Sequence, residues 1–232
     1  MSERQVLLAR SEDTTIEGCT SGESAVCLDL CSCLVRHAAG VLSGVKPASL
    51  FGYVARGGRG VLAGERSRTI RDVLSAAMRA LAGEGLKAMV LDVSDQRYTL
   101  LVYRPAHVAH VLADPDARDF LRALGYEARG CDEVMRTLYV RMRSYYGAAD
   151  RSSRPEYPHE VGLVLGYPLE DVRGFMEGGC ETCRGPWRAF GDERRSRATF
   201  GRVARCEGRC RERYRQGECF GSIVRRPVVS AV

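Results

Sequence analysis

Residues 157–175 read YPHEVGLVLGYPLEDVRGF, and this stretch decides how the rest of the chain is interpreted. Pro158 and Pro168 each open a short apolar run, and proline is tolerated in the first turn of a helix. Gly166 ends the first run, as a glycine that closes a helix does. The stretch therefore predicts two short helices joined by a bend at Tyr167. We expect their apolar side chains to pack against a sheet: Val161, Leu163, Val164, Leu165, Val172, Phe175 and Met176.

The segments on either side supply that sheet and further helices. Residues 86–92 and 98–103 predict two paired strands, and residues 50–54 a third, short strand. Apolar residues recur at helical spacing in several other segments, which we predict to be helices: 26–37, 70–82, 106–113, 116–124, 132–145 and 192–214. The glycine-rich and arginine-rich residues 56–68 predict a mobile loop, and residues 187–190 a short strand. Helices packed around a small hairpin-centred β-sheet indicate the α+β class.

The composition fits one such domain. With 232 residues, of which 45% are hydrophobic, the chain can bury one good core and is too short for two ordinary enzymatic domains. We expect a single domain over residues 25–224, with flexible tails at 1–24 and 225–232. No apolar run approaches the roughly 18 residues that span a bilayer, so we expect no membrane contact and a cytoplasmic location. The ten cysteines would then be thiols or metal ligands.

The net charge of +6 is concentrated at one end of the chain. Residues 201–232 alone carry +5, mostly on the predicted helix 192–214. Few aromatic side chains that could stack on bases lie nearby, only Phe200 and Tyr214. We interpret this helix as a solvated charged face and do not expect nucleic-acid binding, with contact to a phosphate backbone as the alternative.

Several segments together resemble a known family. Residues 157–175 resemble the PHEIG-FLGYP-DV-GFI core of the bacterial family of unknown function DUF3793. Further matches extend over residues 30–224: Arg36-His37, Lys46 to Phe51, Val102-Tyr103-Arg104, Gly185-Pro186-Trp187-Arg188 and Cys206. Family members carry Cys-x-Pro-Thr directly after the histidine that corresponds to His37. This chain has Ala-Ala-Gly-Val there, at residues 38–41. A mechanism that needs a thiol or hydroxyl at that position is therefore not expected here.

Titratable and cationic residues from separated segments predict a ligand pocket. We expect it to bind a small anionic molecule, because convergent cations and proton-handling groups are what such a site requires. The candidates for proton transfer or orientation are His159, Glu160 and His37, and the candidate cations are Lys46, Arg104 and Arg141. The resemblance implies an iron-related or redox-related ligand, since family members are encoded near flavodoxin and iron-uptake genes. The sequence leaves open whether the protein is an enzyme.

Three of these residues carry sharper expectations. His37 shares a helix face with apolar residues, so we expect it to point inward. Arg141 also follows an apolar face, and a buried arginine demands an anionic partner. If Glu160 or Asp171 reaches Arg141, the pair is structural; if neither does, a pocket for an anion is implied. Adjacent residues on a helix point about 100° apart, so His159 and Glu160 should not act as a tight pair.

Cysteines offer a different function. Cys180 and Cys183 have the spacing of half a tetrahedral metal site, and a second pair could complete it, Cys206 and Cys210. Such a site would hold zinc or iron and make the chain a metal-binding or thiol accessory protein. Independent thiols are the alternative. A basic interaction module is the third function that the sequence allows.

Overall fold

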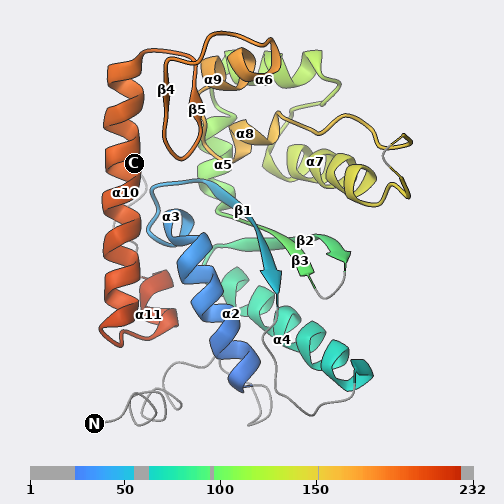
Figure 1. The fold of residues 1–232 in the computed structure, drawn as a ribbon, viewed down its shortest axis with the longest axis vertical. Coiled ribbons are helices and arrows are strands. Elements are labelled where there is room, and N and C mark those ends of the chain that lie inside the picture. Colours follow the sequence, from blue (N-terminus) through green and yellow to red (C-terminus); the bar gives the residue numbers. More distant parts are fainter. Residues whose placement is uncertain (1–23, 55–62, 95–96, 151, 226–232) are drawn as a thin grey trace.

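The computed structural model describes residues 24–54, 63–94, 97–150 and 152–225, and it confirms the α+β fold (Figure 1). Its centre is an antiparallel sheet of three strands in the order β1-β3-β2. Strands β2 (Lys87–Ser94) and β3 (Arg97–Tyr103) form the predicted pair. Strand β1 (Ala48–Val54) pairs with the other edge of β3, so that Ala48 lies opposite Tyr103.

Helices cover both faces of this sheet. Alternate residues of each strand point to opposite sides and so reach two different cores. Leu100 and Val102 face a core built with α2 (Ser24–His37), α4 (Ala63–Gly83) and α11 (Phe220–Arg225). On the opposite side, Leu101 and Tyr103 face a second core. The helices of that second core are α5 (Pro105–Val111), α6 (Pro115–Ala123), α7 (Cys131–Tyr146), α8 (Val161–Val164) and α9 (Leu169–Met176). The prediction of helices packed around a hairpin-centred sheet is thus confirmed.

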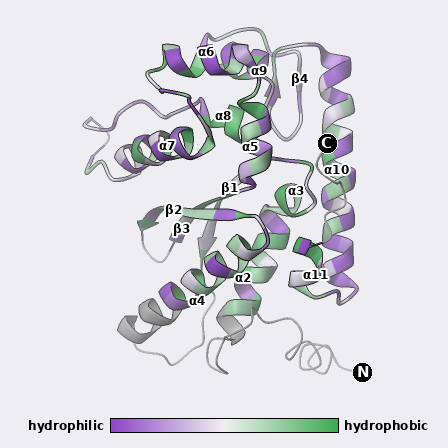
Figure 2. Ribbon diagram, turned by 180° about the vertical axis from the view of Figure 1, so that it is seen from behind, coloured by the Kyte–Doolittle hydropathy of each residue, from purple (hydrophilic) through white to green (hydrophobic). Residues whose placement is uncertain are grey.

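Residues 157–175 lie in the second core, as predicted. Val161, Leu163 and Val172 are buried there, and Figure 2 shows α8 as a strongly hydrophobic element. Phe175 and Met176 depart from the prediction, since they stay 40% and 37% exposed. They lie at the end of α9 that turns away from the core.

The bend after α8 depends on a glycine. Gly166 has a φ of +84°, a left-handed conformation that glycine adopts without steric cost. A Cβ added there would also come within 2.5 Å of Pro47 Cδ. The turn therefore packs closely against the segment that leads into β1.

The carboxy-terminal part forms a third small cluster. Strands β4 (Cys183–Arg184) and β5 (Arg188–Ala189) make a short hairpin, and the long helix α10 (Glu193–Arg215) follows it. Trp187 and Phe200 join the two elements. Figure 1 shows α10 running along one side of the molecule, from this hairpin to α11.

Several boundaries differ from the sequence predictions. Helix α4 begins at Ala63, so the last part of the predicted loop 56–68 is helical, while residues 55–62 lie outside the described structure. The sequence did not predict α3 (Ala39–Leu42) or α11, because runs of four or six residues are too short to show a helical period. The amino-terminal tail and nearly all of the carboxy-terminal tail also lie outside the described residues. Among the helices described, none is long and apolar enough to cross a membrane.

Candidate functional site

A cavity of about 290 Å³ opens where α8 and α9 meet the β4–β5 hairpin. We call it the signature pocket, because most of its walls come from residues 157–175. Its polar or aromatic lining residues are Tyr157, His159, Tyr167, Asp171, Phe175, Trp187 and Arg188. Apolar residues of α8 and α9 and Pro186 complete the lining. A mostly apolar hollow with a few convergent polar groups is the usual form of a small-molecule site.

The rear wall of the pocket is a rigid stack of rings. Tyr167 stacks on Trp187 with ring centroids 4.7 Å apart, and Phe200 meets Trp187 edge-on at 4.6 Å. The indole N–H of Trp187 donates to the buried Asp171 carboxylate at 2.8 Å. Asp171 also accepts backbone N–H bonds from Phe190 and Gly191, so its charge is used to hold the hairpin in place. Asp171 is therefore a structural group of the wall.

His159 is a polar side chain of the pocket that forms no hydrogen bond with any described residue. Its ring lies between Tyr157 and Phe175, with centroid distances of 5.1 and 4.8 Å. The side chain is half-buried, and the described residues give its two ring nitrogens no hydrogen bond. An imidazole can donate one hydrogen bond and accept another. His159 is thus positioned by ring contacts, and its hydrogen-bonding capacity is not used by the described residues.

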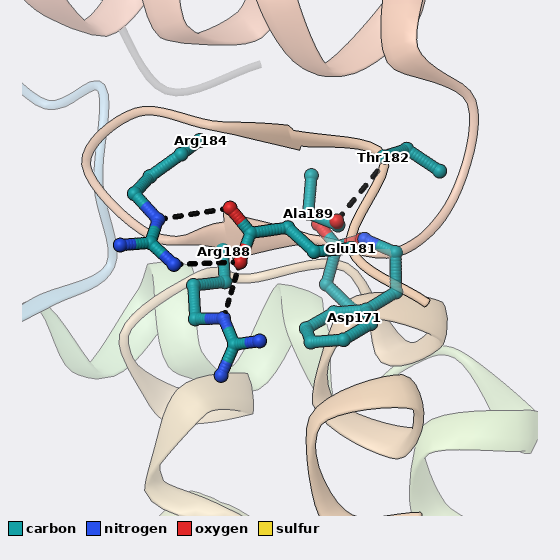
Figure 3. Close-up of polar contacts among 7 residues, drawn as sticks. Asp171, Glu181, Thr182, Arg184, Arg188 and Ala189 are labelled. Atoms are coloured by element: carbon teal, nitrogen blue, oxygen red, sulfur yellow. Dashed lines mark hydrogen bonds and ion pairs between the residues drawn. The ribbon is translucent and has the colours of Figure 1, made fainter. Parts of the chain in front are cut away.

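Arg188 brings a cation to the same pocket, and Figure 3 shows how it is held. Its Nε donates to Glu181 Oε2 at 2.5 Å, and the same carboxylate accepts two bonds of 2.8 Å from Arg184. These hydrogen bonds from Arg184 and Arg188 lower the pKa of Glu181 to about 2. The guanidinium of Arg188 lies over the rings of Phe175 and Phe190, at 5.6 and 5.4 Å.

The terminal nitrogens of Arg188 point away from Glu181 (Figure 3). No hydrogen bond joins them to another described residue. Two parallel N–H donors of a guanidinium match the two oxygens of a carboxylate or phosphate. Arg188 and His159 together give the pocket one fixed cation and one imidazole hydrogen-bonding group.

Glu160 points elsewhere, as expected for a neighbour of His159. Its side chain is only 4% exposed and accepts hydrogen bonds from Tyr126 Oη at 2.8 Å and Arg141 Nη1 at 3.0 Å. Arg141 also donates to the Leu124 carbonyl and lies 4.6 Å above the Tyr126 ring. Glu160 reaches Arg141, so this ion pair is structural, and Arg141 does not imply a pocket for an anion. It holds α7 to the segment before α8.

Lys46 and Arg104 do not line the signature pocket. The Lys46 ammonium lies 5.7 Å from the ring centroid of Tyr167, and burial lowers its pKa. Lys46 thus touches a wall residue without being part of the lining. Arg104 donates to the carbonyls of Val41, Leu42 and Val224 at 2.9, 3.3 and 3.4 Å. It binds the carboxy-terminal ends of α3 and α11, where a cation satisfies carbonyls that have no partner within the helix.

His37 lies apart from the pocket, and the expectation that it points inward is wrong. It is the last residue of α2 and is exposed, with its ring stacked on Phe51 at 5.6 Å. Partial burial and the nearby charges of Arg36 and Arg211 lower its pKa. The helical face that carries its apolar neighbours ends before the chain turns into α3, so the face no longer dictates where His37 points.

The cysteines do not gather into a metal site. Among the described residues, no group of three or more potential ligands could hold a metal ion. Cys183 is buried in the cluster around Trp187, whereas Cys210 is buried in the core beneath α2 and α4. Cys180 is exposed and Cys206 is buried, and all four are free thiols. The four-cysteine site is corrected to independent thiols, because the hairpin and α10 place them in different clusters.

Sequence reasoning missed most of the pocket lining. Arg188, Trp187 and Tyr167 were not named as ligand-binding candidates, although residues 187–190 were predicted as a strand, because no local pattern shows which side chains line a cavity. One signal was present: Trp187 and Arg188 fall in a segment that resembles the family. Residues far apart in the sequence meet at this pocket only because the β4–β5 hairpin folds back onto α9.

Comparison with known proteins places the chain in a family. The profile described as "Protein of unknown function (DUF3793)" matches residues 34–224, which include every element from α3 to α10 and all but the last residue of α11. No curated protein and no solved structure matches the chain. The matched region also contains the whole signature pocket. The chain therefore belongs to the DUF3793 family.

Proposed function

We propose that this protein binds a small, planar, anionic molecule in the signature pocket. The observation that carries the proposal is His159, a half-buried imidazole held between two aromatic rings with no hydrogen-bond partner among the described residues. An imidazole beside a cavity, with ring nitrogens that bond no described residue, can donate one hydrogen bond to a ligand and accept another.

The other lining residues indicate which class of ligand the pocket favours. The ring faces of Tyr157, Phe175 and Trp187 favour a flat, apolar or aromatic body over a flexible one. Arg188 favours a carboxylate or phosphate at one end of that body. A cavity of about 290 Å³ suits a one-ring or two-ring compound. A planar redox-active anion or an aromatic iron-binding acid belongs to this class.

We place this function in the cytoplasm. Cys183, Cys206 and Cys210 are buried as free thiols, which suits a reducing compartment. The proposal is one of binding. Proton transfer by His159 would be a further step that the pocket geometry permits.

Trp187 supplies the test, because it is the single tryptophan of the chain and forms the pocket wall. We expect benzoate to change Trp187 fluorescence in a saturable titration. Cyclohexanecarboxylate has the same charge but a puckered ring, and benzyl alcohol has the flat ring without the charge. Both should bind more weakly than benzoate.

Matched variants locate the binding. Arg188→Gln and His159→Gln should each weaken benzoate binding about tenfold or more, since each removes a hydrogen bond worth about 1.5–3 kcal/mol to a charged group. Arg184→Gln also removes a partner of Glu181 but lies outside the pocket, so its affinity should match the parent. Equal affinity for all three ligands, or an equal loss in all three variants, would refute the proposal.

A further inference from the structure

Helix α10 sorts its arginines into two groups. Four arginines make ion pairs with glutamates: Arg197 with Glu193, Arg211 with Glu207, Arg213 with Glu218 and Arg215 with Glu212. Five others are exposed and make no ion pair with any residue that the structure describes: Arg194, Arg195, Arg202, Arg205 and Arg209. Counting net charge by segment cannot separate the two groups, because it treats paired and unpaired arginines alike.

The five unpaired arginines share one face. At about 100° per residue they fall within an arc of about 100°, and they extend over about 22 Å of helix. We call this surface the arginine face. The opposite side of α10 is buried through Val203, Cys206 and Cys210. Figures 1 and 2 show α10 along one side of the molecule, and all five arginines of this face are exposed.

A hollow adjoins the amino-terminal half of this face. It measures about 360 Å³ and lies between α10 and α5. Arg195 and Arg202 line one side, with Thr199 between them, and His110 lines the other. Asp114 also lines the hollow and carries a negative charge, but its carboxylate already accepts a hydrogen bond from the backbone N–H of Asp116 at the start of α6. The hollow is therefore a cationic recess that could receive a phosphate group.

We propose that the arginine face binds the phosphate backbone of double-stranded nucleic acid without reading its sequence. Guanidinium groups bind phosphate through paired N–H donors, and a duplex offers a continuous row of phosphates. The residues between the arginines are small, Ala198, Gly201 and Gly208, so nothing blocks close approach. One side of α10 packs against the protein along its length, so the helix cannot enter a groove deeply enough to contact base edges.

The chemistry of this face excludes two other partners. Single-stranded nucleic acid is held by stacking on aromatic side chains, and the arginine face carries none. Interfaces between proteins need an apolar centre, which five arginines separated by alanine and glycine do not supply. The phosphate backbone of a duplex is the remaining partner, because binding it requires only positive charge on the protein surface.

The test is the salt dependence of binding to a fluorescently labelled duplex, measured by fluorescence anisotropy with the full chain. Each phosphate neutralised contributes roughly −0.9 to the slope of log K against log salt, so five arginines predict a slope of about −4.5. The double variant Arg202→Gln/Arg209→Gln should reduce the magnitude of that slope by about 2 and weaken binding. The control Arg197→Gln/Arg215→Gln removes the same charge from paired positions and should leave the slope unchanged.

Three outcomes would overturn the proposal. The first is equal slopes for the two double variants, which would show that only total charge matters. The second is no binding to the duplex at low salt. The third is displacement of the duplex by polyglutamate as effectively as by unlabelled duplex, which would identify an acidic protein as the partner. Circular dichroism of both variants checks that α10 remains folded.

Discussion

Replacing Glu160 with alanine should destabilise the fold, because this carboxylate is the acceptor at the centre of a buried polar contact. Removing it leaves the hydroxyl of Tyr126 buried without an acceptor, at a cost of about 1–3 kcal/mol. It also removes a charged hydrogen bond to Arg141, worth about 1.5–3 kcal/mol. Arg141 is 36% exposed, so water restores part of its solvation. We therefore expect a loss of about 3 kcal/mol, near the lower end of the range for a broken buried pair.

Urea denaturation measures this loss as a lower midpoint with an unchanged slope. Glu160→Gln should lose only about 1–2 kcal/mol, because the amide oxygen can still accept from Tyr126. Glu156→Ala is the matched control: Glu156 is exposed and lines the same surface cavity as Glu160 and Arg141, so the loss of stability should stay within about 0.5 kcal/mol. The reasoning is refuted if Glu160→Ala and Glu156→Ala are equally stable, or if Glu160→Gln keeps its stability but no longer binds benzoate.

Three further predictions follow from single residues. Lys46→Met should be more stable than the parent at pH 7, because burial lowers the folded-state pKa of Lys46. The stability of the parent should therefore rise as the pH approaches 10.5, the usual pKa of a lysine. The difference in denaturation midpoints between variant and parent should shrink over that range. Gly166→Ala should lower the melting temperature, because it forces a Cβ into a left-handed conformation and against Pro47; an unchanged value would contradict the close packing described. In a thiol-reagent time course followed by peptide mapping, exposed Cys180 should react well before Cys210, since burial raises the pKa of Cys210 to about 11; the reverse order would be inconsistent with the burial of Cys210.

Local patterns predicted most of the fold. The β2–β3 pair and the long helices were visible because their apolar residues repeat over seven or more residues. Residues 157–175 predicted α8, the turn at Gly166 and α9 from proline, glycine and apolar positions alone. The short elements α3, α11 and β4 escaped, because runs of two to six residues show no repeating period, whereas β5 lies within the strand predicted at residues 187–190.

The candidate site was predictable only in part. His159 was identified from the sequence and lines the pocket, whereas Glu160 beside it serves the scaffold. The other cations were plausible by residue type, but their partners are set by tertiary contacts. Arg104 meets carbonyls 63 and 120 residues away in the sequence, and no local pattern reveals such partners. Arg188 was missed for the same reason, since its place over Phe175 depends on how the hairpin packs on α9.

The most direct test of the proposed pocket is the nuclear magnetic resonance spectrum of the histidine ring nitrogens, recorded as benzoate is added. The chain has four histidines, and only His159 lines the signature pocket. The proposal predicts that the ring nitrogen signals of His159 shift and saturate, while those of His37, His107 and His110 stay in place. Unchanged His159 signals at benzoate concentrations that saturate the Trp187 fluorescence change would contradict it.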